Sequence, residues 1–144
     1  MMLSIDTNIL FAALEASTPG HDQARAFLES HSDNDAMVIC ELILVELYLL
    51  LRNPAVVTTP LSAGAASRLI QTLRHNPKWR LVENASVMTA AWEHAGRDQF
   101  ARRKLIDIRL ALTLRHHGVT EFATVNGADF QNLGFHRVWN PLGE

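Results

Sequence analysis

Short apolar runs alternate along this chain with longer segments in which apolar residues recur every three or four positions. Five runs have the length and apolar content of buried strands: residues 3–5, 37–40, 79–82, 121–125 and 137–139. The segments between them predict helices over 8–16, after Thr18-Pro19, over 41–52, over 59–76, after Asn84 and over 105–116. This alternation is typical of an α/β domain with a mostly parallel sheet. In such sheets the functional crevice lies beyond the carboxyl ends of the strands, so polar residues at those ends are the first candidates for a site.

Composition narrows the class of protein. The length of 144 residues fits one domain, so residues 1–144 are expected to form a single unit, and 48% hydrophobic with 19% charged residues indicates a folded chain. A formal net charge of -2 argues against a protein that coats nucleic acid through overall basic charge. Any nucleic-acid binding would need a local basic patch or a bridging cation.

The sequence predicts a cytoplasmic protein. Cys40 is the only cysteine, so an internal disulfide is impossible and a reducing compartment is expected. The first residues lack the basic region of a signal peptide, and Asp6 interrupts their apolar run. The longest apolar stretch, residues 37–51, contains Glu41 and Glu46 and is too short and too charged to span a bilayer.

Two acidic residues lie at positions where the apolar pattern favours a different side chain. Asp6 follows the first strand, where it could cap the next helix or bind a metal. Glu46 has apolar residues three and four positions away on both sides, which predicts that it faces the core. A charge there is costly unless it binds a metal, forms a buried salt bridge or reaches the rim. Glu41, in the first turn of the same helix, better suits a structural role, because the helix dipole favours an acid there.

A second pair of acids lies in the last third of the chain. Asp107 shares a helical face with Leu110 and Ala111, which indicates either a buried polar site or a cap near the start of the helix. Asn126 and Asp129 follow the strand at 121–125, although Asn126-Gly127 is also a plain turn signal.

These acids are expected to meet at one edge of the sheet. Clustered carboxylates repel one another, which raises their pKa values unless a cation holds them. A ligand set made only of oxygen atoms suits Mg²⁺ or Mn²⁺. Such a cluster is suited to phosphodiester hydrolysis, in which the metal activates water and orients the phosphate.

The segments that contain these acids resemble the four motifs of PIN domains, in order and over nearly the whole chain. They are IDTNIL at 5–10, CELILVEL at 40–47, IDIRLA at 106–111 and TVNGADF at 124–130. Cys40 stands where PIN domains often have Ser, and in the last motif relatives carry Thr, then Asn or Asp, then often an Asp-Phe pair. The order and spacing are similar in particular to the VapC toxins of bacterial VapBC toxin–antitoxin pairs.

The resemblance implies a PIN-like three-layer α/β/α fold around a central, mostly parallel sheet of four to five strands. It implies a Mg²⁺- or Mn²⁺-dependent endoribonuclease that forms a homodimer, binds a VapB-like antitoxin and cleaves RNA. Carried over by residue, the metal ligands and catalytic acids are Asp6, Glu46, Asp107 and Asp129, with Asn126 as the other candidate for the fourth position. The residues expected to orient them by hydrogen bonds are Thr7, Asn8 and Asn126.

A basic stretch precedes Asp107 and is a candidate RNA-binding rim or a solvated helix end: Arg97, Arg102, Arg103 and Lys104. Other protein classes fit less well. A receiver domain would have a second acid beside Asp6 and a Lys after the strand at 121–125, and a haloacid-dehalogenase-like phosphatase would have Asp rather than Asn8. The remaining alternative is a catalytically silent PIN domain that binds RNA or a protein partner.

Overall fold

Five short strands form the centre of the molecule. The computed structural model of the chain describes residues 1–143. The strands are β1 (Met2–Ile5), β2 (Val38–Cys40), β3 (Arg80–Val82), β4 (Val119–Ala123) and β5 (Arg137–Trp139). Each of the five predicted runs therefore overlaps a strand, although β4 begins and ends two residues earlier than the run at 121–125.

The strands are parallel and divide into two sheets. One sheet has the order β1-β4-β5, and β2 pairs with β3 in the other. A single parallel bridge between Leu3 and Met37 joins them, supported by a 3.0 Å bond from the Leu3 N–H to the Ala36 carbonyl. The buried Ser4 hydroxyl adds a 2.6 Å bond to the Val38 carbonyl. The predicted α/β class and parallel sheet are confirmed, with the strands arranged across the molecule as β3-β2-β1-β4-β5.

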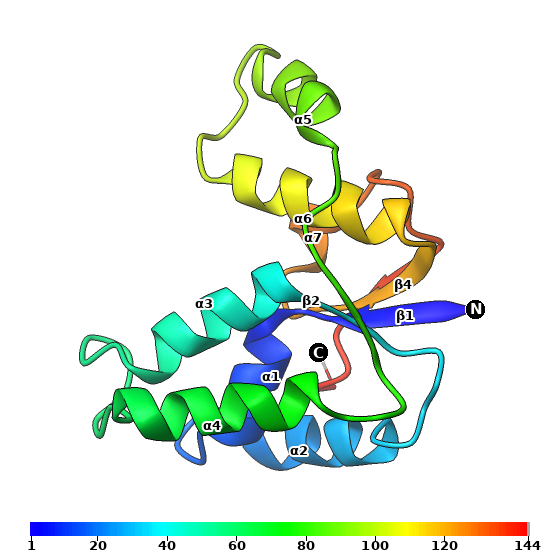
Figure 1. Cartoon of the computed structure of the whole chain (residues 1–144). Coiled ribbons are helices and arrows are strands. Elements are labelled where there is room, and N and C mark those ends of the chain that lie inside the picture. Colours follow the sequence, from blue (N-terminus) through cyan, green and yellow to red (C-terminus); the bar gives the residue numbers. More distant parts are fainter. Residues whose placement is uncertain (144) are drawn as a thin grey trace.

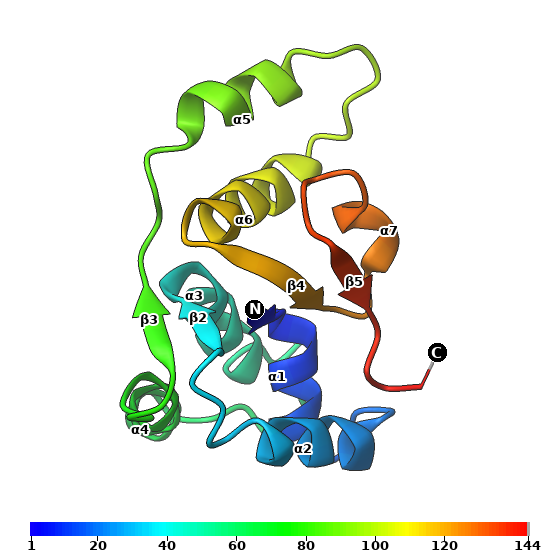
Figure 2. The ribbon, with the colours of Figure 1, turned by 90° about the vertical axis from the view of Figure 1, so that its right-hand side faces the viewer.

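Helices cover both faces of this arrangement. One layer contains α1 (Thr7–Leu14), α2 (His21–Ser30), α3 (Glu41–Leu51) and α4 (Ala63–Arg74). The other contains α5 (Met88–Ala95), α6 (Lys104–His116) and the short α7 (Gly127–Phe130), as Figures 1 and 2 show. Across residues 1–143, no helix has the length and apolar content needed to cross a membrane.

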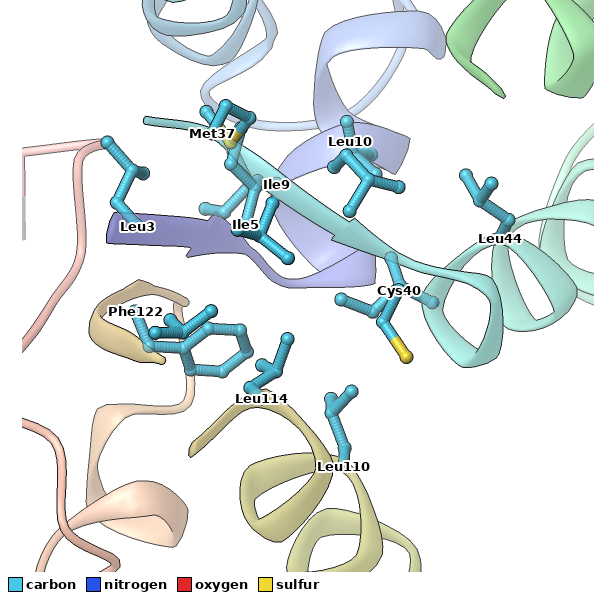
Figure 3. Close-up of a cluster of buried hydrophobic side chains, with 14 of the residues drawn as sticks. Leu3, Ile5, Ile9, Leu10, Met37, Cys40, Leu44, Leu110, Leu114 and Phe122 are labelled. Atoms are coloured by element: carbon cyan, nitrogen blue, oxygen red, sulfur yellow. The ribbon is translucent and has the colours of Figure 1, made fainter. Parts of the chain in front are cut away.

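The core lies between the strands and these two layers. In Figure 3, Leu110 and Leu114 of α6 approach the strands from one side, and Ile9 and Leu10 of α1 lie on the other. Ile5 of β1 lies between them, and it is fully buried. This apolar contact fixes β1 and its carboxyl end, because burial of each large aliphatic side chain contributes about 1.5–3 kcal/mol.

Three helix starts and one turn differ from the sequence-based expectations. The helix expected over 59–76 begins at Ala63, because the Ser62 hydroxyl caps it by accepting a bond from the Ala65 N–H. Gly20, not Thr18-Pro19, precedes α2, with a φ of 80° that suits glycine. Val87 rather than Asn84 precedes α5, because the Asn84 side chain instead accepts a 3.3 Å bond from the Thr113 hydroxyl. The expected turn after residue 125 contains the single helical turn of α7.

Candidate active site

The register of β1 and β4 places Asp6 beside Thr124. The last paired residues of these strands are Ile5 and Ala123, so the next residue of each strand emerges at the same edge. The Asp6 N–H donates to the Ala123 carbonyl at 2.9 Å, which extends the pairing by one step. The carboxyl ends of two adjacent parallel strands thus deliver a carboxylate and a hydroxyl to one point.

Asp6 is buried and held from three directions. Its Oδ1 accepts a 2.8 Å bond from the Thr7 N–H, so Asp6 does cap α1. Its Oδ2 accepts bonds from the Thr124 hydroxyl at 2.6 Å and from the Asn8 amide at 3.3 Å. Burial raises the pKa of Asp6 in spite of these hydrogen bonds, and the nearby charge of Asp129 adds to the rise. Cap and candidate ligand are therefore compatible roles, because the cap uses only one of the two lone pairs of Oδ1.

Glu46 does not face the core. Its side chain is exposed, and the buried side of α3 consists of Ile43, Leu44, Leu47 and Leu51. The expectation of a core-facing Glu46 was wrong because α3 has leucines on every side, and Leu49 is 60% exposed. Protein atoms nevertheless surround the carboxylate closely enough for desolvation, with the charges of Asp6 and Asp107, to raise the pKa of Glu46. Glu46 thus lies at the border of the acid cluster rather than inside the core.

Asp107 lies in the first turn of α6. This helix precedes β4 and runs back along it, so its first turn lies near the strand's carboxyl end. The half-buried Asp107 is not the helix cap, a position held by Arg103. Desolvation, followed by the charges of Asp129 and Asp6, raises the pKa of Asp107 to about 6. The acids therefore influence one another electrostatically, which is what convergence at one edge predicts.

The fourth acid, Asp129, belongs to α7, the short helix that follows β4. Asp129 is exposed in α7, and its charge raises the pKa values of both Asp6 and Asp107. The neighbouring Asn126 contributes through its backbone, because its N–H donates to the Thr124 hydroxyl oxygen at 3.0 Å. Its side chain is exposed. This arrangement favours Asp129 over Asn126 as the fourth charged group.

The donor chemistry fits a hard divalent cation. Among residues 1–143, neither Asp6, Glu46, Asp107 nor Asp129 forms a salt bridge, so these charges have no cationic side chain to neutralise them directly. In the same part of the chain, no three acidic, histidine or cysteine side chains are close enough to make a ready-formed ion site. Glu46 is exposed and Asp107 half-buried, so both side chains are free to turn towards Asp6 without disturbing the core. The residues present therefore suit Mg²⁺ or Mn²⁺, with side-chain adjustment on binding.

The hydrogen-bond network around Asp6 differs in part from the one expected. Asn8 takes the expected orienting position: its amide reaches Asp6 and the Thr124 hydroxyl, and its carbonyl oxygen accepts from the Val125 N–H at 3.3 Å. The Thr7 hydroxyl instead donates to the Ile43 carbonyl at 3.3 Å, so it ties α1 to α3 and contacts Asp6 only through its backbone. Thr124, fully buried, makes the shortest bond to the carboxylate.

Sequence reasoning gave no role to Thr124 or Arg109. The available signal for Thr124 was its place as the Thr that opens the last PIN-like motif, TVNGADF at 124–130. Arg109 stands two residues after Asp107, and its Nε is the only buried side-chain nitrogen or oxygen without a hydrogen-bond partner among the described residues. Its charge lowers the pKa of Glu46, opposing the effect of the neighbouring acids. The signal for Arg109 was a positive charge between the apolar residues Ile108 and Leu110 of a predicted helix.

The basic stretch separates into two parts. Arg97 and Lys104 line a common cavity, whereas Arg102 and Arg103 are exposed and do not line it. Lys104 begins α6, and its charge acts on Asp107 one turn later. Part of the stretch therefore lies beside the acids.

Comparison with known proteins agrees with this geometry. The family described as "PIN domain" matches residues 3–136. A curated relative, Ribonuclease VapC24 of Mycobacterium tuberculosis (strain ATCC 25618 / H37Rv), is 54% identical over 141 residues, which cover 98% of this chain and 97% of the relative.

Solved structures have the same fold. Mycobacterium tuberculosis VapC20, described as a sarcin-ricin loop cleaving toxin, gives a TM-score of 0.65 with 19% identity, covering 92% of this chain and 95% of that one. FitAcB from Neisseria gonorrhoeae gives a TM-score of 0.64 with 21% identity over 99% of this chain and 100% of that one. At these identities the likeness concerns the fold alone.

Proposed function

The chain belongs to the PIN-domain family, and on that premise we propose that it is a metal-dependent endoribonuclease, the toxin of a VapBC-type toxin–antitoxin pair. The observation that carries the proposal is the buried Asp6 carboxylate at the shared edge of β1 and β4, with three further acids in electrostatic range. Identity of 54% to a ribonuclease over nearly the full length supports the same activity here.

We assign Asp6, Glu46, Asp107 and Asp129 as the carboxylates that hold Mg²⁺ or Mn²⁺. Asp6 is the fixed member, because Thr7, Thr124 and Asn8 restrain both of its oxygens. The other three have exposed or half-buried side chains that adjust to the ion. When bound, the ion would supply a Lewis acid and a water of lowered pKa for attack on a phosphodiester.

The protein side chains contribute orientation and charge. The Thr124 hydroxyl and the Asn8 amide both donate to Oδ2 of Asp6, whereas Oδ1 accepts only from the Thr7 N–H, so Oδ1 keeps one lone pair in a fixed direction. Asn8 connects Asp6 to the backbone of Val125, so hydrogen bonds join the start of α1 to the loop after β4. A pKa near 6 leaves Asp107 largely ionised at neutral pH, the form that binds a cation.

The proposed partners are RNA, an antitoxin and a second copy of the chain. The last is supported by apolar side chains that the fold leaves exposed: Val45, Leu49, Trp92 and Ile106 are each more than half exposed. Sedimentation at micromolar concentration tests the dimer, and a clean monomer would contradict it.

The activity is tested by RNA cleavage with purified wild type and Asp6→Asn, each in Mg²⁺, Mn²⁺ and EDTA. Cleavage by the wild type that needs the metal and is lost in Asp6→Asn is expected. Asp35→Asn, an exposed acid remote from the site in sequence, is the matched control and should cleave normally. Equal cleavage by Asp6→Asn would contradict the assignment, and a wild type inactive on RNA would indicate a silent PIN domain.

A further inference from the structure

A cavity of about 240 Å³ lies between the α5–α6 loop, the first turns of α6 and the segment after α7. Its lining is polar and basic with one aromatic ring, and the residues that matter are His94, Arg97, Phe100, Lys104, Gln131 and Asn132. This combination of cations, a ring and side-chain amides lies in one small hollow and takes no part in the hydrogen bonds that hold Asp6.

The cavity adjoins the acid cluster. Lys104 and Ile108 line it from α6, and Asp107 stands between them in the sequence. The charge of Lys104 acts on Asp107, so the two side chains are within electrostatic reach. Gln131 also lines the cavity, and it follows directly after α7, the helix that carries Asp129. The cavity therefore shares α6 with Asp107 and borders the end of the helix that carries Asp129.

The cations of the cavity are available to an anion. The Arg97 guanidinium donates to Nδ1 of His94 at 3.1 Å, which orients it without neutralising it. Within the described part of the chain, neither Arg97 nor Lys104 forms a salt bridge with a carboxylate. Guanidinium and ammonium groups free of acidic partners are the usual contacts of RNA phosphates.

The segments that shape the cavity hold unusual backbone conformations. Gln99, beside Phe100, and Asn132 both have a φ of 63°. This left-handed region is uncommon for residues other than glycine, and such residues gather at ligand-binding sites. Asn132 lines the cavity, and Gln99 precedes the lining residue Phe100.

We propose that this cavity binds one unpaired nucleotide of the RNA substrate beside the phosphodiester that is cut, with its phosphate on Arg97 and Lys104 and its base against Phe100. The inference rests on the proposed ribonuclease function and adds the selection of the cut site to it. Unpaired bases are recognised by stacking on aromatic rings and by hydrogen bonds to their edges, which the amides of Gln131 and Asn132 can supply. The volume suits one nucleotide rather than a duplex.

The test uses Phe100→Leu, which keeps the apolar bulk but removes the ring, and Phe100→Tyr, which keeps a ring. Asp98→Asn is the matched control, because it changes an exposed charged side chain of the same loop that does not line the cavity. The probe is a short single-stranded RNA with a randomised central segment, whose cleavage ends are sequenced and whose kcat/KM is measured with Mg²⁺. The loss of one base stack predicts a kcat/KM about 5- to 150-fold lower for Phe100→Leu, which is 1–3 kcal/mol at 1.4 kcal/mol per factor of ten.

Phe100→Leu should also lose the base preference at one position near the cut, while Phe100→Tyr and Asp98→Asn keep it. Identical preference and kcat/KM in Phe100→Leu and Asp98→Asn would overturn the inference and leave the ribonuclease function intact. Binding of the same RNA, followed by fluorescence anisotropy in the inactive Asp6→Asn background, separates the two proposals. Weaker binding on adding Phe100→Leu supports the nucleotide site even if no cleavage is found, and unchanged binding contradicts it.

Discussion

Replacement of Asp107 by Asn should stabilise the metal-free protein at neutral pH. The folded state raises the pKa of this carboxyl from 3.8 to about 6, so ionising it costs more in the folded than in the unfolded chain. A shift of about two units corresponds to a ceiling of about 3 kcal/mol at 1.36 kcal/mol per unit. Solvent screens this half-buried group, and we expect a gain of about 1 kcal/mol, or about 2–4 °C in Tm for a chain of this size.

The sign depends on pH in a defined way. Between the unfolded pKa of 3.8 and the folded pKa of about 6, the folded state binds more protons, so the penalty from Asp107 grows as pH rises through this window. Thermal melts in EDTA should therefore show Asp107→Asn above wild type at about pH 7.5 and equal to it at about pH 4. Asp35→Asn serves as the control for loss of one exposed charge. A variant no more stable than this control at neutral pH would refute the electrostatic description of the site.

Three further predictions concern residues around and away from the acids. Thr124→Val should lower Mn²⁺ affinity and RNA cleavage about 10- to 100-fold, because it removes the hydroxyl that holds Asp6. Thr124→Ser keeps a hydroxyl and should retain most of both. Wild-type Mn²⁺ affinity and cleavage in Thr124→Val would contradict this. The thiol of Cys40 is fully buried and its pKa is raised by burial, so Ellman's reagent should label it only after unfolding, and rapid labelling of the native protein would argue otherwise. Arg74 donates from Nε at 2.9 Å and Nη2 at 2.8 Å to Glu41, so Arg74→Ala should cost about 0.5–1 kcal/mol in urea unfolding while RNA cleavage stays unchanged.

The alternation of elements could be predicted because it depends on local apolar periodicity. Each short run became a strand, and the helices at 41–51 and 104–116 were expected within one residue. The exposure of Glu46 could not be predicted in the same way. A helix that is apolar on all sides does not reveal which leucines face the core, so the position of Leu49 depends on where α3 packs.

The sequence pattern brought forward the candidate acids but not the hydrogen bonds that support them. Asp6 stands out because a carboxylate follows a buried strand, a pattern visible in the sequence. Its bond to Thr124 joins residues 118 positions apart and exists only because β1 pairs with β4 in one register. The hydroxyl of Thr7 bonds to α3 instead of to the acid, since the packing of α1 on α3 brings the Ile43 carbonyl within reach. Tertiary register, which local pattern does not encode, decides these partners.

The most direct test of the carboxylate cluster is Mn²⁺ binding, followed by the electron paramagnetic resonance signal of the free aqueous ion, for wild type, Asp6→Asn, Asp107→Asn and the Asp35→Asn control. The geometry predicts that wild type and Asp35→Asn remove the free-ion signal with the same affinity, and that Asp6→Asn and Asp107→Asn bind much more weakly. Equal Mn²⁺ affinity in all four proteins would show that these acids do not form the metal site.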